Sequence, residues 1–79
     1  MRIDKFLKVA RIIKRRTIAK EFCDAGKVRL NDRIAKAGDV VKPDDILTIQ
    51  FGQRFVRFRV IALHEHASKG TAETMVEEV

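Results

Sequence analysis

The spacing of apolar residues predicts two short helices at the start of the chain. Apolar side chains recur three and four positions apart, as on one face of a helix, at Ile3, Phe6, Leu7 and Ala10. A second stripe of this kind is formed by Ile18, Ala19, Phe22, Cys23 and Ala25. Asp4 and Thr17 are candidate N-caps, because their side-chain oxygens can accept hydrogen bonds from free backbone N–H groups. Gly26 favours the end of the second helix.

After Gly26 the apolar positions alternate with polar ones, which predicts strands. The alternation covers residues 28–30, 33–35, 46–51 and 56–60. Asn31–Asp32 and Gly52–Gln53 are suited to two-residue turns between these strands. We therefore expect an α+β fold in which two N-terminal helices pack on a small, mostly antiparallel sheet of about four strands.

The chain is predicted to form one domain at residues 1–63, followed by an acidic, loosely ordered tail at residues 64–79. In this tail four glutamates outnumber Lys69, and Gly70 interrupts the apolar pattern. The apolar residues of the tail do keep helical spacing, so a short docking helix is the alternative. Isolated helices of this length are only marginally stable in water, which favours the loosely ordered tail.

Charge is concentrated in the first half of the chain. The sequence has 17 Lys and Arg against 11 Asp and Glu, a net charge of +6, and residues 1–36 hold twelve of these bases but only four of the acids. This half therefore carries +8 and the remainder −2. So basic a surface attracts polyanions, of which nucleic acid is the commonest in a cell. An anionic membrane surface is the alternative partner. If there is no partner, these lysines and arginines simply solvate the surface of the helices.

The predicted RNA contacts are bases of this half together with one carboxylate. Residues 12–16 place three consecutive bases at the start of the second helix, where free N–H groups and the helix dipole favour an anion. Arg16 can donate two parallel hydrogen bonds to one phosphate, and Asp4 either orients Arg2 or caps the first helix. The candidate site residues are Arg2, Asp4, Lys5, Lys8, Arg11, Lys14, Arg15, Arg16, Lys20, Lys27, Arg29 and Arg33.

No residue pattern indicates catalysis, so we expect a protein that is not an enzyme and has no cofactor. Cys23 lies in the apolar stripe of the second helix and is expected to be a buried structural thiol. His64 and His66 share one face of a strand, but two ligands do not make a metal site. Four phenylalanines are expected in the core, and Phe55 either is exposed or forms the rim of the core.

The single cysteine excludes an intramolecular disulfide and fits a reducing compartment. No apolar run approaches the roughly 20 residues that span a bilayer, and the N-terminus lacks the pattern of a signal peptide. We expect a cytoplasmic monomer with no membrane partner.

The segment RIDKFLKVARIIKRRTIAKEFCDAGKVRLNDRIAKAGDVVKPDDILTI, which begins at Arg2, resembles the alpha-L RNA-binding domain of ribosomal small-subunit protein four. The resemblance covers about residues 2–60. It combines RIDKFL at the first helix, RRTIA at the second, GKVRLN at the first strand and KPDDIL before a later strand. The sequence departs from the family at Asp32, where glycine is usual, which leaves the type of that turn open.

Among free-standing copies of this domain, the segments IKRR at residues 13–16 and FGQR at residues 51–54 resemble ribosome-associated quality-control subunits of Gram-positive bacteria. This resemblance implies binding to stalled large ribosomal subunits that carry peptidyl-tRNA, with contacts to an rRNA stem-loop and the tRNA. It also implies a partner factor that adds C-terminal alanine tails. The motif positions most tied to this role are Arg2, Asp4 and Arg16.

Three alternatives remain open at this stage. A related heat-shock family rescues stalled large subunits, but its members usually have a longer, basic C-terminal extension. Two short helices with a basic connector also suit a helix-turn-helix module for duplex DNA. A protein-interaction domain or membrane-surface binder is the third alternative, for which association should be insensitive to salt.

Overall fold

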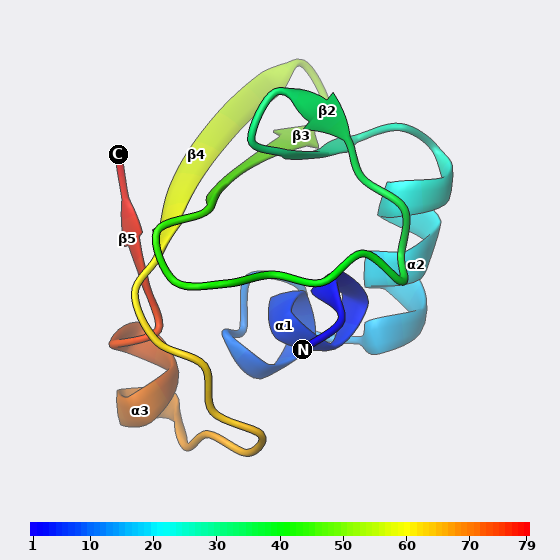
Figure 1. Ribbon diagram of the computed structural model, residues 1–79. Coiled ribbons are helices and arrows are strands. Elements are labelled where there is room, and N and C mark those ends of the chain that lie inside the picture. Colours follow the sequence, from blue (N-terminus) through cyan, green and yellow to red (C-terminus); the bar gives the residue numbers. More distant parts are fainter.

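Helices cover one face of a curved antiparallel sheet in the computed structural model, which describes residues 1–79 (Figure 1). The elements are α1 (Ile3–Val9), α2 (Arg16–Asp24), β1 (Val28–Leu30), β2 (Arg33–Ile34), β3 (Ile46–Phe51), β4 (Arg54–Val60), α3 (Lys69–Glu73) and β5 (Val76–Glu78). The sheet has five strands in the order β2-β1-β3-β4-β5, and all neighbours are antiparallel. The predicted α+β fold is therefore confirmed. None of the helices is long and apolar enough to cross a bilayer.

The core lies between α1 and the inner face of the sheet, the face that is turned toward the helices. Phe6 and Leu7 of α1 are fully buried, and so are Leu47 and Ile49 of β3, whereas Thr48 between them stays partly exposed. Burial of an apolar side chain of this size contributes about 1.5–3 kcal/mol. This contact therefore holds α1, with its charged side chains, in a fixed position on the sheet.

Backbone groups of a distant loop satisfy the start of α1. Arg2 occupies the N-cap position and has no capping side chain. The N–H of Ile3 donates to the carbonyl of Asp39 at 2.7 Å, and the N–H of Asp4 donates to that of Ala37 at 3.3 Å. The prediction that Asp4 is the N-cap residue is wrong, because Arg2 holds that position and the loop carbonyls satisfy the first two N–H groups of the helix. Asp4 lies inside the first turn, where its carboxylate accepts a hydrogen bond from the N–H of Lys5 and retains room for other partners.

Helix α2 begins earlier than predicted. Arg16 is its first residue, Arg15 is in the N-cap position and no side chain caps the helix, so the prediction of a cap at Thr17 is wrong. The predicted end at Gly26 is confirmed, because Gly26 has a φ of +73°, a conformation that glycine adopts without penalty. Without a side-chain cap, N–H groups in the first turn of α2 are free to bind an external acceptor.

Both predicted two-residue turns are present, since the strands that they join end at facing residues. Asn31 has a φ of +57°, while Asp32 does not adopt a positive φ. Glycine is therefore not required at position 32, and the departure from the family pattern costs no backbone strain there.

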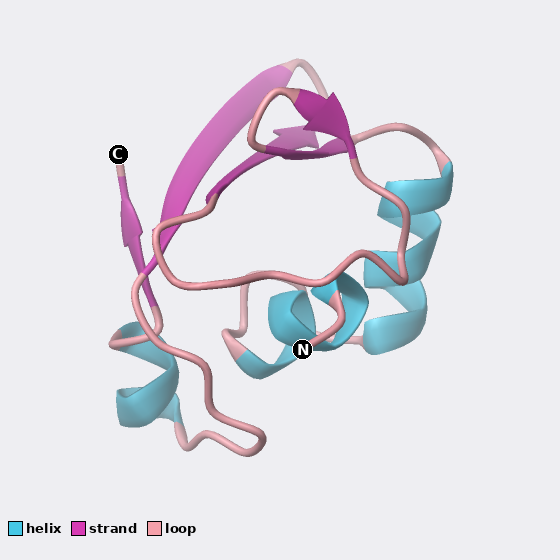
Figure 2. Ribbon diagram, viewed as in Figure 1, coloured by secondary structure: helices cyan, strands magenta, loops and turns pink.

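Residues 64–79 pack against the domain, in contrast to the predicted loose tail. Figure 2 shows α3 followed by β5, which lies beside β4. Ser68 caps α3 by accepting a hydrogen bond from the N–H of Thr71 at 3.3 Å. Met75 is fully buried, and its carbonyl accepts a hydrogen bond from the N–H of Ile61 at 2.7 Å. Strand pairing and the burial of Met75 thus order this segment and give the sheet its fifth strand.

Candidate RNA-binding surface

A buried carboxylate holds two arginines together where α1 and α2 meet. Asp4 is only 3% exposed. The Nε and Nη2 of Arg2 donate to its Oδ1 and Oδ2 at 3.2 Å each, and the Nη2 of Arg16 donates to Oδ1 at 3.4 Å. The backbone N–H of Lys5 also donates to Oδ1, at 2.8 Å. These bonds satisfy the carboxylate, as a charge removed from water requires. We refer to Arg2 and Arg16, bound to Asp4, as the arginine pair.

The arginine pair keeps Asp4 ionised. Burial alone would raise the pKa of Asp4, but the hydrogen bond from Arg16, that from the backbone of Lys5 and the charges of both arginines outweigh it. The pKa of Asp4 therefore lies below its ordinary value of 3.8. Asp4 contacts Arg2, as the sequence suggested, and it contacts Arg16 as well.

The arginine pair presents its remaining hydrogen-bond donors to solvent. The side chains of Arg2 and Arg16 are 51% and 47% exposed, and each guanidinium retains N–H groups that Asp4 does not use. Guanidinium groups held in place in this way lose little side-chain entropy when they bind a phosphate. Arg16 is also the first residue of α2, so a phosphate bound to it lies near the free N–H groups of that helix.

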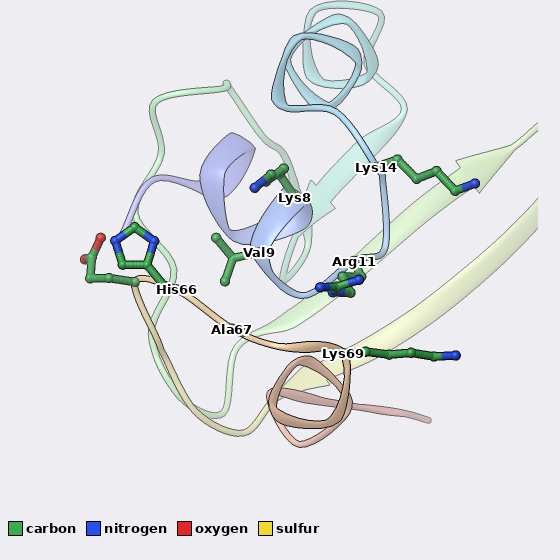
Figure 3. A pocket seen from close by; sticks show the side chains of 8 residues that line it. Lys8, Val9, Arg11, Lys14, His66, Ala67 and Lys69 are labelled. Carbon is green, nitrogen blue, oxygen red and sulfur yellow. The ribbon is translucent and has the colours of Figure 1, made fainter.

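A concave site, which we call the basic cleft, lies between α1 and the segment that leads to α3 (Figure 3). Its volume is about 530 Å³, and its lining residues are Lys8, Val9, Arg11, Lys14, Glu65, His66, Ala67 and Lys69. In Figure 3 the side chains of Lys14 and Lys69 extend to the same side, with Arg11 between them. None of the four cationic side chains has a carboxylate oxygen within 4.0 Å. Unpaired cations in a cleft attract an anion strongly, because the low-dielectric walls focus their field.

Arg11 has an unusual backbone conformation at the end of α1. It follows the C-cap residue Ala10 and has a φ of +61°. A left-handed conformation costs a residue with a side chain roughly 1–2 kcal/mol, and glycine avoids this cost. The backbone conformation at this position favours glycine, but the arginine that is present contributes a positive charge to the basic cleft.

The C-terminal segment supplies part of the cleft lining, and none of these residues was predicted from the sequence to belong to the RNA surface. Lys69 and His66 belong to the stretch that was predicted to be a loose tail. Glu65 forms an ion pair with Lys5 of α1, and the hydrogen bond and charge of Lys5 lower the pKa of Glu65. No local pattern could reveal these residues, because they reach α1 only after the chain returns from β4.

The structure gathers eight of the twelve predicted site residues around α1 and the start of α2, namely Arg2, Asp4, Lys5, Lys8, Arg11, Lys14, Arg15 and Arg16. The other four are dispersed. Lys20 forms an ion pair within α2, and the ammonium of Lys27 lies 5.5 Å from the centre of an aromatic ring. Arg29 and Arg33 lie on β1 and on the edge strand β2, and neither forms an ion pair or side-chain hydrogen bond with residues at the helix termini.

Cys23 is unsuited to act as a nucleophile. Burial, together with the charges of Asp4, Asp24 and Asp39, raises the pKa of the Cys23 thiol to about 11. The thiol is therefore protonated at neutral pH and packs as a small apolar group. No three His, Cys or carboxylate side chains lie close enough together to hold a metal ion.

Comparison with known proteins shows the family to which the chain belongs. Residues 1–47 match the S4 domain. The chain is 51% identical over 77 residues to the RQC P-site tRNA stabilizing factor of Halalkalibacterium halodurans, covering 98% of this chain and 88% of the relative. It is also 51% identical over 75 residues to the factor of that name from Bacillus subtilis, covering 95% and 87%. The chain belongs to the S4-domain family of RQC P-site tRNA stabilizing factors.

The fold of this family is shared with a heat-shock protein. The trimeric structure of Vibrio cholerae heat shock protein 15 has a TM-score of 0.92 to this chain at 25% identity, and the match covers 100% of this chain and 81% of that one. The S4-domain match includes the arginine pair and three of the four cleft cations. Lys69, the fourth, lies beyond it, so the basic cleft joins the S4 domain to the C-terminal segment.

Proposed function

We propose that this protein binds stalled large ribosomal subunits that carry peptidyl-tRNA, through contacts to rRNA and tRNA. It thereby supports the addition of C-terminal alanine tails by a partner factor, and it acts by holding RNA, without chemistry of its own. The arginine pair carries the proposal, because its fixed, half-exposed guanidinium groups lie at the starts of α1 and α2. Three of the four unpaired cleft cations, Lys8, Arg11 and Lys14, lie on α1 and on the segment that joins these two helices. Structured RNA offers phosphates and 2′-hydroxyls more readily than base edges, which suits such a surface.

The names of the relatives support the ribosomal part of this proposal. They describe factors that stabilise a P-site tRNA in RQC, and two of them align with nearly the whole chain at 51% identity. The alanine-tailing partner is a further step that follows from the resemblance alone, and it needs its own test.

A second candidate function is the rescue of stalled large subunits in heat shock. The likeness to heat shock protein 15 supports it, since the two folds agree with a TM-score of 0.92. Both functions would use the same basic surface. They therefore differ in the partner protein and in the fate of the nascent chain, and RNA affinity does not separate them.

Affinity purification of the tagged chain at low and moderate salt tests the RNA partner. We expect it to recover large subunits with peptidyl-tRNA, and we expect Arg16→Gln to lower this recovery roughly tenfold. Arg16→Gln removes the charge and keeps an N–H donor for Asp4, so the fold should persist. Lys42→Gln is the matched control, because Lys42 is exposed in the loop between β2 and β3 and belongs neither to the arginine pair nor to the lining of the basic cleft. Undiminished recovery with Arg16→Gln, or recovery of DNA or protein alone, would contradict the proposal.

The alanine content of stalled nascent chains in cells tests the tailing step. We expect Arg16→Gln to reduce C-terminal alanine tails and Lys42→Gln to leave them unchanged. Normal tailing combined with poor survival after heat shock would instead favour the rescue function.

A further inference from the structure

The outer face of the sheet, which is turned away from α1 and α2, has cationic groups of its own. Side chains alternate along a strand, so Thr48 points outward between the buried Leu47 and Ile49. The strand register places Arg29 of β1 on one side of Thr48 and Arg57 of β4 on the other. The two arginines are therefore two strand spacings apart, roughly 10 Å.

Neither Arg29 nor Arg57 has an acidic partner within 4.0 Å. In contrast, Arg59 is paired with Glu77 at 2.7 Å and with Asp44 at 3.7 Å. A groove of about 360 Å³ on the outer face is lined by Arg29, Asn31, Asp32, Ile46, Thr48 and Arg57. With two arginines and a single carboxylate among these residues, the groove has a net charge of +1. It therefore suits the few phosphates of a short single strand better than the dense phosphates of a duplex.

Phe55 adds an exposed aromatic ring to this face. It is 62% exposed, whereas the other four phenylalanines of the chain are buried or half-buried. Phe55 faces Gln50 of β3 and is two residues from Arg57 along β4, so both side chains project from the same face about 7 Å apart. An exposed ring contributes favourable free energy only when a ligand covers it and removes its apolar surface from water.

We propose that the outer face is a second RNA-binding surface, specific for unpaired nucleotides. Phe55 stacks on a base, and Arg29 and Arg57 bind the phosphates that flank it. Only an unpaired base leaves its ring face free for such stacking, and any of the four bases can stack, so little sequence preference is expected. The inference goes beyond the proposed function, because this face lies on the opposite side of the sheet from the arginine pair. Two RNA segments can then be held at the same time.

Tryptophan fluorescence gives a direct readout of this stacking, because the chain contains no tryptophan or tyrosine. The variant Phe55→Trp keeps a stacking ring and adds a single fluorophore on the outer face. Titration with an oligouridylate of about 12 nucleotides should quench its emission. We expect Phe55→Ala, measured with a labelled oligouridylate, to bind roughly 5- to 100-fold more weakly. Unchanged affinity of Phe55→Ala would overturn the proposal.

Second substitutions in the Phe55→Trp background separate the two surfaces. Adding Arg57→Glu should abolish the quenching, while adding Lys42→Glu, the matched charge reversal, should leave it intact. Adding Arg16→Gln should also leave it intact, even where binding to large subunits is weakened. Quenching that survives Arg57→Glu, or that is lost with Arg16→Gln, would show that oligouridylate binds elsewhere.

Sedimentation distinguishes RNA from a second copy of this chain as the occupant. If the outer face is a contact between copies, association should rise with protein concentration and disappear in Phe55→Ala, with oligouridylate affinity unchanged. That result would overturn the proposal. Since Phe55 and Arg57 are exposed, their variants should fold, and melting temperatures close to that of the original chain verify this.

Discussion

Asp4 is the residue on which the arginine pair depends. The substitution Asp4→Asn keeps the size of the side chain and removes the charge that both guanidinium groups contact. We expect it to lower the free energy of unfolding by about 1–3 kcal/mol at neutral pH, because it weakens a set of buried charge-assisted hydrogen bonds. It should also weaken binding to large subunits. Urea denaturation and co-sedimentation measure the two effects, and Asp32→Asn in an exposed turn is the control.

The acid dependence of stability gives a separate check on Asp4. The pKa of Asp4 is lower in the folded chain than its ordinary value of 3.8, so the folded state binds the proton less tightly. The stabilisation is therefore fully present well above pH 3.8 and is lost as the pH falls below that value toward the lowered pKa. In urea denaturation at a series of pH values, Asp4→Asn should lack this loss. The same acid dependence in both chains would contradict the ionised arrangement.

Arg11 offers a substitution that separates binding from folding. Arg11→Gly removes a cation from the basic cleft at a position where the φ of +61° favours glycine. We expect the free energy of unfolding to stay constant or to rise by up to about 1 kcal/mol, since relief of strain is partly offset by the greater freedom of the unfolded chain. Affinity for large subunits should fall, and the dependence of affinity on salt should decrease by about one phosphate contact.

The matched control for this prediction is Arg11→Ala, which removes the same charge but retains the strained backbone. It should reduce binding as much as Arg11→Gly without the gain in stability. If both variants bind large subunits like the original chain, the basic cleft is not part of the RNA surface.

At the scale of elements, α3 and β5 hold one wall of the basic cleft. Met75 anchors them, because its side chain is fully buried and its backbone pairs with Ile61. We expect Met75→Ala to lower the free energy of unfolding by about 2–5 kcal/mol. Binding should weaken too, since Lys69 is held less firmly. Thermal denaturation and co-sedimentation measure these effects, and the exposed Glu73→Ala should change stability little. Stability close to that of the original chain in Met75→Ala would contradict an anchoring role.

At the scale of the whole molecule, charge separates along the chain into a basic N-terminal half and a slightly acidic remainder. Six cations without a role in the core face the proposed RNA surface, namely Arg2, Lys8, Arg11, Lys14, Arg16 and Lys69. If each neutralises a phosphate, affinity for large subunits should fall by about three orders of magnitude between 50 and 200 mM salt. Binding assays at a series of salt concentrations measure this, and an affinity insensitive to salt would favour a protein partner.

The fold could largely be predicted from the chain because its cues are local. The stripe that contains Phe6 and Leu7, the glycine at position 26 and the alternation through Leu47 and Ile49 depend on neighbours a few positions away. The helix caps could not be predicted in this way. The start of α1 is satisfied by carbonyls of Ala37 and Asp39, which are more than thirty residues distant in the sequence.

The sequence by itself determined the helix and strand periods, the basic first half and the motif that contains Arg2, Asp4 and Arg16, because these depend on residue type and spacing. Only the tertiary structure decided which charges meet. Packing of α1 against α2 places two guanidinium groups on one buried carboxylate. After β4 the chain turns back toward α1, which brings Lys69 to the cleft, and β5 then pairs with β4. Such contacts join residues far apart in the chain, and their energy comes from burial and charge pairing that no local pattern contains.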